Sequence, residues 1–235
     1  LGPRNQDAPP NALFHQRIIN GVHIFSDVAS SMGVDDRGWT HCVGAWDYDQ
    51  DGFMDLISLN DFGTSLVYRN EDGTHFVEGS RALHLDTIYN AMNFELLDLD
   101  HSGNPSLYIT QIHKMTHRER YPLPSGATRL RFEHLGNTRT LVRNVLLQRH
   151  HNGLFHNVHD IRVEPAEHGW AWDAGTFDYE NDGDVDLLVL NGTETDSPMA
   201  TGETREQYLG GRVFMSQHGN QRNVCYLAEE GYFYN

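Results

Sequence analysis

The sequence predicts an all-β fold made of repeated units of short antiparallel strands. Its 22 glycines and 8 prolines in 235 residues, with few long runs of helix formers, favour many short strands joined by turns. Two further observations support the repeat. A hairpin pattern recurs four times along the chain, and an acidic loop recurs three times at a nearly constant distance behind one of these hairpins.

The hairpin pattern is a short apolar strand, a polar turn with glycine, and then an aromatic or apolar residue. Such segments are typical of β-hairpins. They occupy residues 13–25, 66–76, 143–155 and 222–233. We therefore expect four hairpins distributed over the whole chain.

The acidic loops read "DYDQDGFMDL" at 47, "DLDHSGNPSL" at 98 and "DYENDGDVDL" at 178. From the hairpin glycine to the first loop aspartate, the distance is 26 residues for Gly21 to Asp47, 25 for Gly73 to Asp98 and 25 for Gly153 to Asp178. The segments before and after the loops, such as "HCVGAW" and "LISLN", are apolar and β-rich. The spacing predicts a unit with a fixed interior and variable connections.

Units of this kind are typical of propeller blades. We expect residues 1–235 to form one β-propeller, or part of one, with four-stranded blades that carry calcium loops. The expected blades are 13–65, 66–142 with an insertion at 111–142, 143–221 with an insertion at 192–221, and the start of a fourth at 222–235. The polar insertions should lie as loops on one face.

Charge excludes some classes of partner. Seventeen basic and 33 acidic residues give a net charge of −16, which disfavours nucleic acid and anionic membrane surfaces and favours cations. No apolar run is long enough to span a bilayer. The chain begins at Leu1, so either a signal peptide has been removed or the stretch belongs to a longer polypeptide. Cys42 and Cys225 are expected to be separate, buried thiols.

The acidic loops have the residue types that a hard cation requires. Carboxylates at positions one, three and five of an extended loop point the same way, and glycine at position six permits the turn that returns position nine to the same point. Calcium takes six to eight oxygen ligands, whereas magnesium demands tighter octahedral geometry. Calcium is therefore the expected ion.

The predicted ligands differ between the three loops. The first loop would use Asp47, Asp49, Asp51, Asp55 and the carbonyl of Phe53, and the third would use Asp178, Glu180, Asp182, Asp186 and the carbonyl of Asp184. Glu180 is one methylene longer than aspartate, which favours contact through a water. The second loop has Asp98, Asp100, Ser102, Asn104 and Ser106 at the same positions. It lacks two carboxylates, so we expect a weak or empty site there.

Two alternative interpretations fit parts of the loop pattern. A solvated acidic turn is the simpler one, because Asp and Gly are ordinary turn residues. Three loops in constant register argue against it. An EF-hand requires a glutamate at position twelve and flanking helices, but Ser58 and Val189 stand there between β-rich segments.

These loops resemble the FG-GAP or VCBS repeat, the calcium-binding blade of integrin α-subunit propellers. "DYDQDGFMDL" and "DYENDGDVDL" match the D-x-D-x-D-G-x-x-D-L core of that repeat, with Glu180 as the one substitution. The stretches "FSDVASSMGV", "GWAWDAGTFDYENDGDVDLLVLNG" and "RNVCYLAEEGYF" resemble the ASPIC/UnbV group, which includes cartilage acidic protein. The resemblance implies a secreted or cell-surface propeller that serves adhesion or assembly, or a periplasmic one in a bacterium.

Several other patterns carry weaker hypotheses. His113 and His117 are spaced like ligands on one helix face, although a solvated loop is favoured over a transition-metal site. Trp170 and Trp172 could form a sugar-stacking face, but packing residues are favoured. Asn191 begins an N-glycosylation sequon, and a plain Asn-Gly turn is an equal alternative.

Three functions follow from these observations. The leading one is an extracellular propeller with structural calcium that binds a protein or a glycan, and it is not an enzyme. The second is a polysaccharide-binding or lyase-like propeller with a groove around Arg118, Arg120, Tyr121 and Arg131. The third is a subunit of an extracellular multi-chain assembly or filament, in which further copies or further blades cover exposed strand edges.

Overall fold

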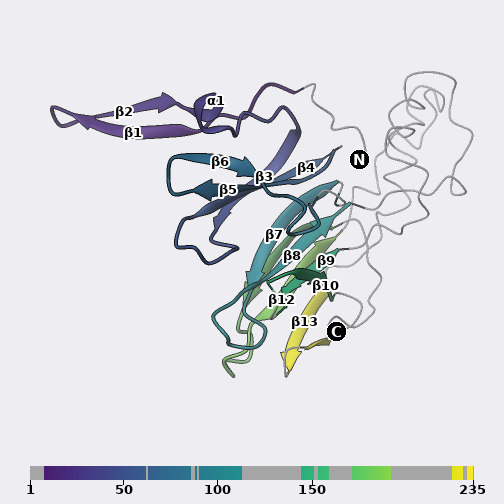
Figure 1. The fold of residues 1–235 in the computed structure, drawn as a ribbon. Coiled ribbons are helices and arrows are strands. Elements are labelled where there is room, and N and C mark those ends of the chain that lie inside the picture. The colour runs from purple at the N-terminus through teal and green to yellow at the C-terminus, as the bar shows by residue number, and fades with distance from the viewer. Residues whose placement is uncertain are drawn as a thin grey trace, which may run out of the picture. The chain divides into compact units, whose positions relative to one another are not determined.

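A computed structural model describes residues 8–61, 63–85, 88, 90–112, 144–150, 153–158, 171–191, 224–229 and 232–234. These residues form strands and one short helix (Figure 1). The chain divides into two compact units, which split between Tyr89 and Asn90. The predicted all-β class is confirmed, with several antiparallel sheets as expected.

The first unit contains a two-stranded sheet and a four-stranded sheet. Strands β1 (Phe14–Ile19) and β2 (Val22–Asp27) form a hairpin, and helix α1 (Ala29–Met32) follows it. The four-stranded sheet has the order β3-β4-β5-β6. Its strands are β3 (Trp39–Trp46), β4 (Asp55–Asp61), β5 (Leu66–Glu71) and β6 (His75–Glu78).

The second unit contains two four-stranded sheets, each of which is an antiparallel meander. One sheet has the order β10-β9-β8-β7 and the other β11-β12-β13-β14. Their strands are β7 (Ala91–Leu97), β8 (Ser106–Gln111), β9 (Val145–Arg149), β10 (Phe155–Asn157), β11 (Ala171–Phe177), β12 (Asp186–Asn191), β13 (Val224–Glu229) and β14 (Tyr232–Tyr234).

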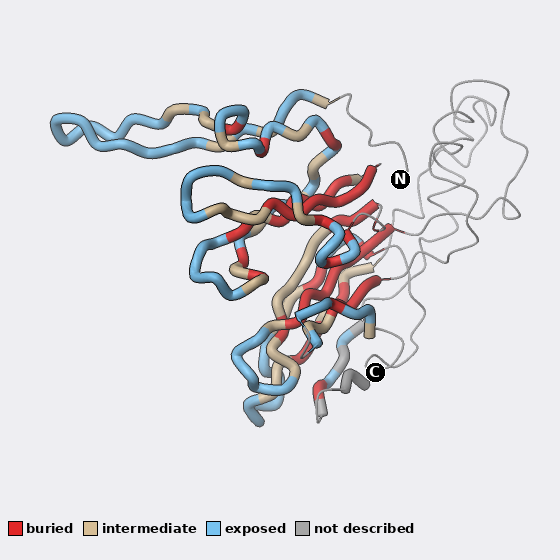
Figure 2. The backbone as a smooth tube through the Cα atoms, viewed as in Figure 1, coloured by how far each residue is buried: buried red, intermediate tan, exposed pale blue. Residues whose placement is uncertain are grey.

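The second strand of each four-stranded sheet carries several buried residues, and β4 and β8 are buried along most of their length (Figure 2). Ile57 and Leu59 of β4 and Leu107 of β8 are fully buried. Both faces of β4 and β8 carry buried residues, including the polar Ser58 and Asn60 of β4 and Thr110 of β8, so strict alternation of buried and exposed positions is absent. Complete burial of one such side chain stabilises the fold by about 1.5–3 kcal/mol.

The two sheets of the second unit share a core. Leu97, Tyr108 and Leu146 of one sheet cluster with Ala174 and Leu187 of the other. Polar contacts also cross between the sheets: the Asn93 side chain donates to the Ala174 carbonyl at 3.4 Å, and the Thr176 hydroxyl donates to Glu95 at 3.4 Å. The sheets are therefore packed layers of one unit.

The sheets divide the chain at different points from the expected blades 13–65, 66–142 and 143–221. Each expected hairpin from the second onward forms the last two strands of a four-stranded sheet, as β5–β6, β9–β10 and β13–β14 do. Each acidic loop joins the first two strands of a sheet. The four sheets thus span residues 14–27, 39–78, 91–157 and 171–234.

Several other predictions can be placed on the structure. No disulfide joins Cys42 and Cys225, so these thiols are separate as expected, but Cys42 is only half-buried and Cys225 is exposed, whereas both were expected to be buried. The expected insertions lie outside the described residues except at residues 111 and 112, and so do His113, His117 and Trp170. In the described part of the chain, no helix is long and apolar enough to cross a membrane.

Candidate metal centre

The first acidic loop connects β3 to β4 and turns back sharply between them. Gln50 and Gly52 adopt positive φ angles of 66° and 92°. A glycine suits the second of these positions because side chains rarely tolerate that conformation. The second and third loops repeat this geometry at His101 and Gly103, and at Asn181 and Gly183. The sequence prediction that glycine at position six makes the turn is confirmed in all three loops.

Backbone N–H groups orient the first carboxylate of the loop. Asp47 accepts from the N–H of Asp51 at 3.1 Å and from that of Gly52 at 3.0 Å, one bond to each oxygen. Asp98 of the second loop and Asp178 of the third loop accept from the corresponding N–H groups in the same way. The first residue of each loop therefore stabilises the turn through hydrogen bonds that need no cation.

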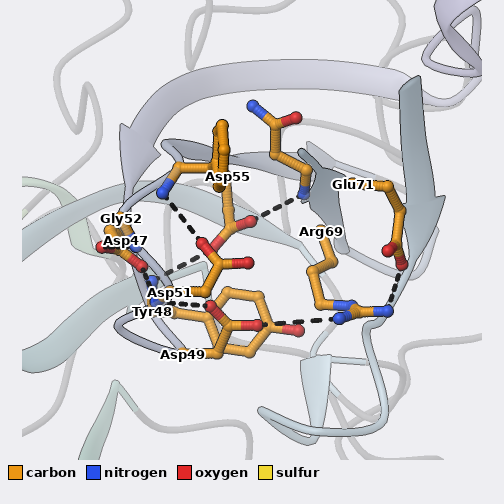
Figure 3. Close-up of polar contacts among 10 residues, drawn as sticks. Asp47, Tyr48, Asp49, Asp51, Gly52, Asp55, Arg69 and Glu71 are labelled. Carbon is orange, nitrogen blue, oxygen red and sulfur yellow. Dashed lines mark hydrogen bonds and ion pairs between the residues drawn. The ribbon is translucent and has the colours of Figure 1, made fainter. Parts of the chain in front are cut away.

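The ninth residue of the first loop ties the loop to the third strand of its sheet (Figure 3). Asp55 is fully buried, and it accepts from the Tyr48 N–H at 3.1 Å and from the Asn70 N–H at 2.7 Å. In the third loop, Asp186 accepts from the N–H groups of Tyr179 and Ala228 at 2.6 and 2.8 Å. The sequence analysis missed this second role, because a backbone N–H on a distant strand leaves no signal in the residue pattern.

Three carboxylates converge in the first loop. One oxygen from each of Asp47, Asp49 and Asp55 lies within 4.8 Å of the other two. Among the loops, all of which lie in described residues, only the first forms such a group. Asp51, a further predicted ligand, lies outside this group, and its Oδ1 accepts from the Phe53 N–H at 2.8 Å. The third loop holds Asp178, Glu180, Asp182 and Asp186 in the same order along the chain, without this close grouping.

The electrostatics of the first loop reflect its burial and its crowded negative charge. Burial raises the pKa of Asp55, while hydrogen bonds from the Asn70 and Tyr48 N–H groups oppose the rise. Burial also raises the pKa of Tyr48 to about 12, with further contributions from Asp49 and Asp55. Both shifts indicate that an additional negative charge is unfavourable here in the absence of a cation.

Arg69 of β5 is the basic side chain beside this cluster (Figure 3). Its guanidinium lies 4.0 Å from Asp49 and also pairs with Glu71. The arginine is partly exposed, so its attraction to Asp49 is screened by water. It offsets only part of the charge of the three converging carboxylates.

The donor set is compatible with a hard divalent cation. Every donor is a carboxylate oxygen, which suits calcium or magnesium and gives neither a thiolate nor an imidazole for softer metals. Each oxygen has two lone pairs, so a carboxylate oxygen that accepts one backbone N–H can still bind an ion. The backbone N–H groups would thus position the ligands of Asp47 and Asp55 before the ion arrives.

The second loop differs from the first at positions five and nine, where serines replace aspartates. Ser106 is buried at the ninth position, and the N–H of Asn104 is bound by the Ser102 hydroxyl at 3.2 Å. His101 reaches the third loop, where its Nε2 lies 2.8 Å from the Asp184 carboxylate. This contact, which the sequence analysis did not foresee, raises the pKa of His101.

Two remaining predicted residues also lie in the described part. Asn191 ends β12 and is half-buried in register with Ala171. Trp172 of β11 is 39% exposed, beside a register shift between Ala171 and Asp173. Neither position tests the glycosylation or sugar-stacking hypothesis.

Comparison with known proteins bears on the repeat itself. A search of curated proteins found no match to this chain. A family model described as an FG-GAP-like repeat matches residues 47–109, from the first residue of the first acidic loop into β8. The match thus begins at the candidate metal centre and includes the second acidic loop. It supports the FG-GAP/VCBS repeat family for this part of the chain.

Proposed function

We propose that the first acidic loop binds a calcium ion that stabilises its sheet. The observation that supports this most strongly is the convergence of Asp47, Asp49 and Asp55, whose oxygens lie within 4.8 Å of one another. Three carboxylates so close together repel one another unless a cation lies among them. Calcium is preferred to magnesium because protein and water oxygens can complete its larger, more flexible coordination shell.

The remaining predicted ligands have different roles in this proposal. Asp51 serves the turn through its bond to the Phe53 N–H, and it lies outside the close group of three carboxylates. The carbonyl of Phe53 and water would supply further oxygens. The third loop, with Asp178, Glu180, Asp182 and Asp186, is the second candidate. The second loop would bind calcium weakly or not at all.

The wider proposal is that the calcium is structural, and that the repeated sheets are blades of a propeller that binds or assembles with other molecules. Three four-stranded meanders and an FG-GAP-like repeat are compatible with blades. Such repeats are typical of extracellular or cell-surface proteins, which supports a location outside the cytoplasm. The finer resemblance to the ASPIC/UnbV group belongs to the same proposal.

We propose a binding or assembly role without enzymatic activity, and a protein or a glycan as the partner. The glycan-active alternative was drawn from Arg118, Arg120, Tyr121 and Arg131, which lie outside the described residues. The carboxylates that could act as acid and base are assigned to the candidate metal centre. The binding module therefore remains the proposed function.

Isothermal titration of the chain with CaCl₂ tests the metal site. Asp49→Asn is the informative variant, because Asp49 is not fully buried and its bond from the Asp51 N–H is long, at 3.3 Å. We expect it to weaken calcium binding at least about tenfold, since a ligand charge is removed. Asp100→Asn, at the same position of the second loop, is the matched control and should leave the tightest binding step unchanged. Equal affinity in all three proteins would refute the assignment.

A further inference from the structure

The hairpin β1–β2 exposes several large apolar side chains. Its twelve residues are exposed or half-buried, and it pairs with no third strand in the described part of the chain (Figure 2). Phe14, Ile18 and Phe25 expose 60%, 65% and 60% of their surface, and the strand register places them on one face. An exposed apolar face on a free strand edge is a typical site of strand addition.

Comparison with the complete sheets identifies which half of a sheet this hairpin resembles. The residue three positions before the hairpin glycine is Asn70 in β5, and its N–H donates to Asp55. The corresponding residue in β13 is Ala228, three positions before Gly231, and its N–H donates to Asp186. In β1 this position is Ile18, three residues before Gly21. In the β9–β10 hairpin the corresponding residue is His150, whose N–H donates to the Leu154 carbonyl at 2.8 Å. The hairpin β1–β2 therefore has the register of the third and fourth strands of the two sheets whose acidic loop has aspartate at position nine.

The direction of the backbone N–H groups at the β1 edge agrees with this register. Asn20 and Gly21 form a two-residue turn with positive φ angles of 51° and 77°, flanked by the pair Ile19 and Val22. The pair that flanks such a turn exchanges hydrogen bonds, and the next pair does not. The N–H of Ile18 consequently points to the free edge, where a carboxylate could accept from it.

The charge on the edge also matches an acidic loop. In the first four-stranded sheet, Arg69 lies four residues before the hairpin glycine Gly73, and its guanidinium lies beside Asp49 of the acidic loop. The same position holds Arg17 in β1 and Arg149 in β9. Arg17 lies on an exposed strand, where its guanidinium donates to the Ser26 hydroxyl at 3.3 Å.

We propose that the free edge of β1 binds the inner strand pair of another FG-GAP-like unit, one whose two strands are joined by an acidic loop. The carboxylate at loop position nine accepts from the Ile18 N–H, and the carboxylate at position three pairs with Arg17. The second strand of the incoming pair lies antiparallel to β1. The apolar side chains of β1 and β2 then become part of a four-stranded sheet.

A peptide of residues 39–61 tests this proposal, because it contains such a strand pair with its loop. The peptide carries Cys42→Ser and is added to the full ¹⁵N-labelled chain, with NMR as the readout. A saturable shift of the Ile18 amide is expected. It should occur in chelator as well as in calcium, because Arg17 and the Ile18 N–H contact the carboxylates directly. Failure here would therefore leave the calcium proposal untouched.

Variants on both sides make the experiment decisive. Arg17→Ala should weaken binding about threefold or more through the lost ion pair, and a peptide with Asp55→Asn should bind about tenfold more weakly. Ile18→Pro removes the donor without breaking a β1–β2 hydrogen bond, and it should abolish the binding. Arg69→Ala is the matched control and should have no effect.

Three results would overturn the proposal. The first is the absence of any shift at millimolar peptide. The second is binding that depends on Arg69 and not on Arg17, which would mean that the peptide replaces the chain's own β3–β4 pair. The third is self-association of the unmixed chain through the Ile18 edge, which would make a second copy the occupant.

Discussion

The first and second acidic loops have nearly the same backbone but different side chains. In both, the opening aspartate accepts two backbone N–H bonds, and glycine at position six has a positive φ angle. They differ at position nine, where Asp55 bridges to the Asn70 N–H of β5 and Ser106 stands in the second loop. The turn therefore does not need the complete set of carboxylates.

This difference separates two roles that the D-x-D-x-D-G-x-x-D pattern combines. The opening aspartate and the glycine make the turn, and the second loop retains both. The aspartates at positions three and nine complete the convergent group of the first loop. The convergence of the three carboxylates, and not the turn itself, distinguishes a candidate ion site from a solvated acidic turn.

The largest expected effect is the loss of the Asp55 bridge. Asp55→Ala leaves two N–H groups without their acceptor, at Tyr48 and Asn70, which should lower the free energy of unfolding by roughly 2–5 kcal/mol. Ser106→Ala in the second loop is the matched control, and it should cost about 1 kcal/mol. Urea denaturation of both variants measures the difference. Equal losses would contradict the proposed distinction between the loops.

The carboxyl groups of the two loops should also titrate in opposite directions. Burial raises the pKa of Asp55, so its contribution to stability is present below the unfolded pKa and is lost as pH rises through the folded value. A hydrogen bond from the Ser102 side chain lowers the pKa of Asp100. Its contribution is therefore present above the unfolded pKa and is lost as pH falls.

Carboxyl ¹³C NMR in chelator measures both titrations in one sample. Asp55 should titrate above 3.8, the ordinary value for aspartate, and Asp100 below it. Adding calcium should lower the apparent pKa of Asp55, because a bound cation favours the ionised form. The same addition should leave Asp100 nearly unchanged. Identical calcium responses would remove the difference between the loops.

The smallest expected effect concerns the contact from the second loop to the third. The hydrogen bond to Asp184 raises the pKa of the exposed His101. Asp184→Asn should therefore lower this pKa toward the ordinary histidine value, as measured by NMR. Any stability from the contact is present below the unfolded pKa and disappears as pH rises through the folded one. An unchanged His101 titration would show that the contact does not form in solution.

Much of this architecture could be predicted from the sequence. The four hairpins and three acidic loops were expected from glycine placement and apolar patterning, and the structure contains strands at each of them. Short-range rules suffice here, because turn conformation depends on a few neighbouring residues. The positive φ of Gly52 and its two equivalents is the clearest example.

The remaining features depend on long-range pairing. The sequence gives no reason to place an acidic loop between the first two strands of a sheet instead of between two sheets. The bridge from Asp55 to Asn70 spans 15 residues and uses a backbone N–H that every non-proline residue has. Two other contacts likewise could not be predicted from the residue pattern. They are the hydrogen bond from the Phe53 N–H to Asp51 and the contact between His101 and Asp184.

The calcium dependence of thermal unfolding tests the central claim most directly. The melting curve of the chain is recorded in chelator and in calcium, for the wild type, Asp49→Asn and Asp100→Asn. Free calcium at 100 times the dissociation constant should stabilise the wild type by about 2.7 kcal/mol and raise its melting temperature. Asp100→Asn should retain this gain, and Asp49→Asn should lose most of it. Superimposed wild-type curves with and without calcium would contradict a structural calcium site in the first loop.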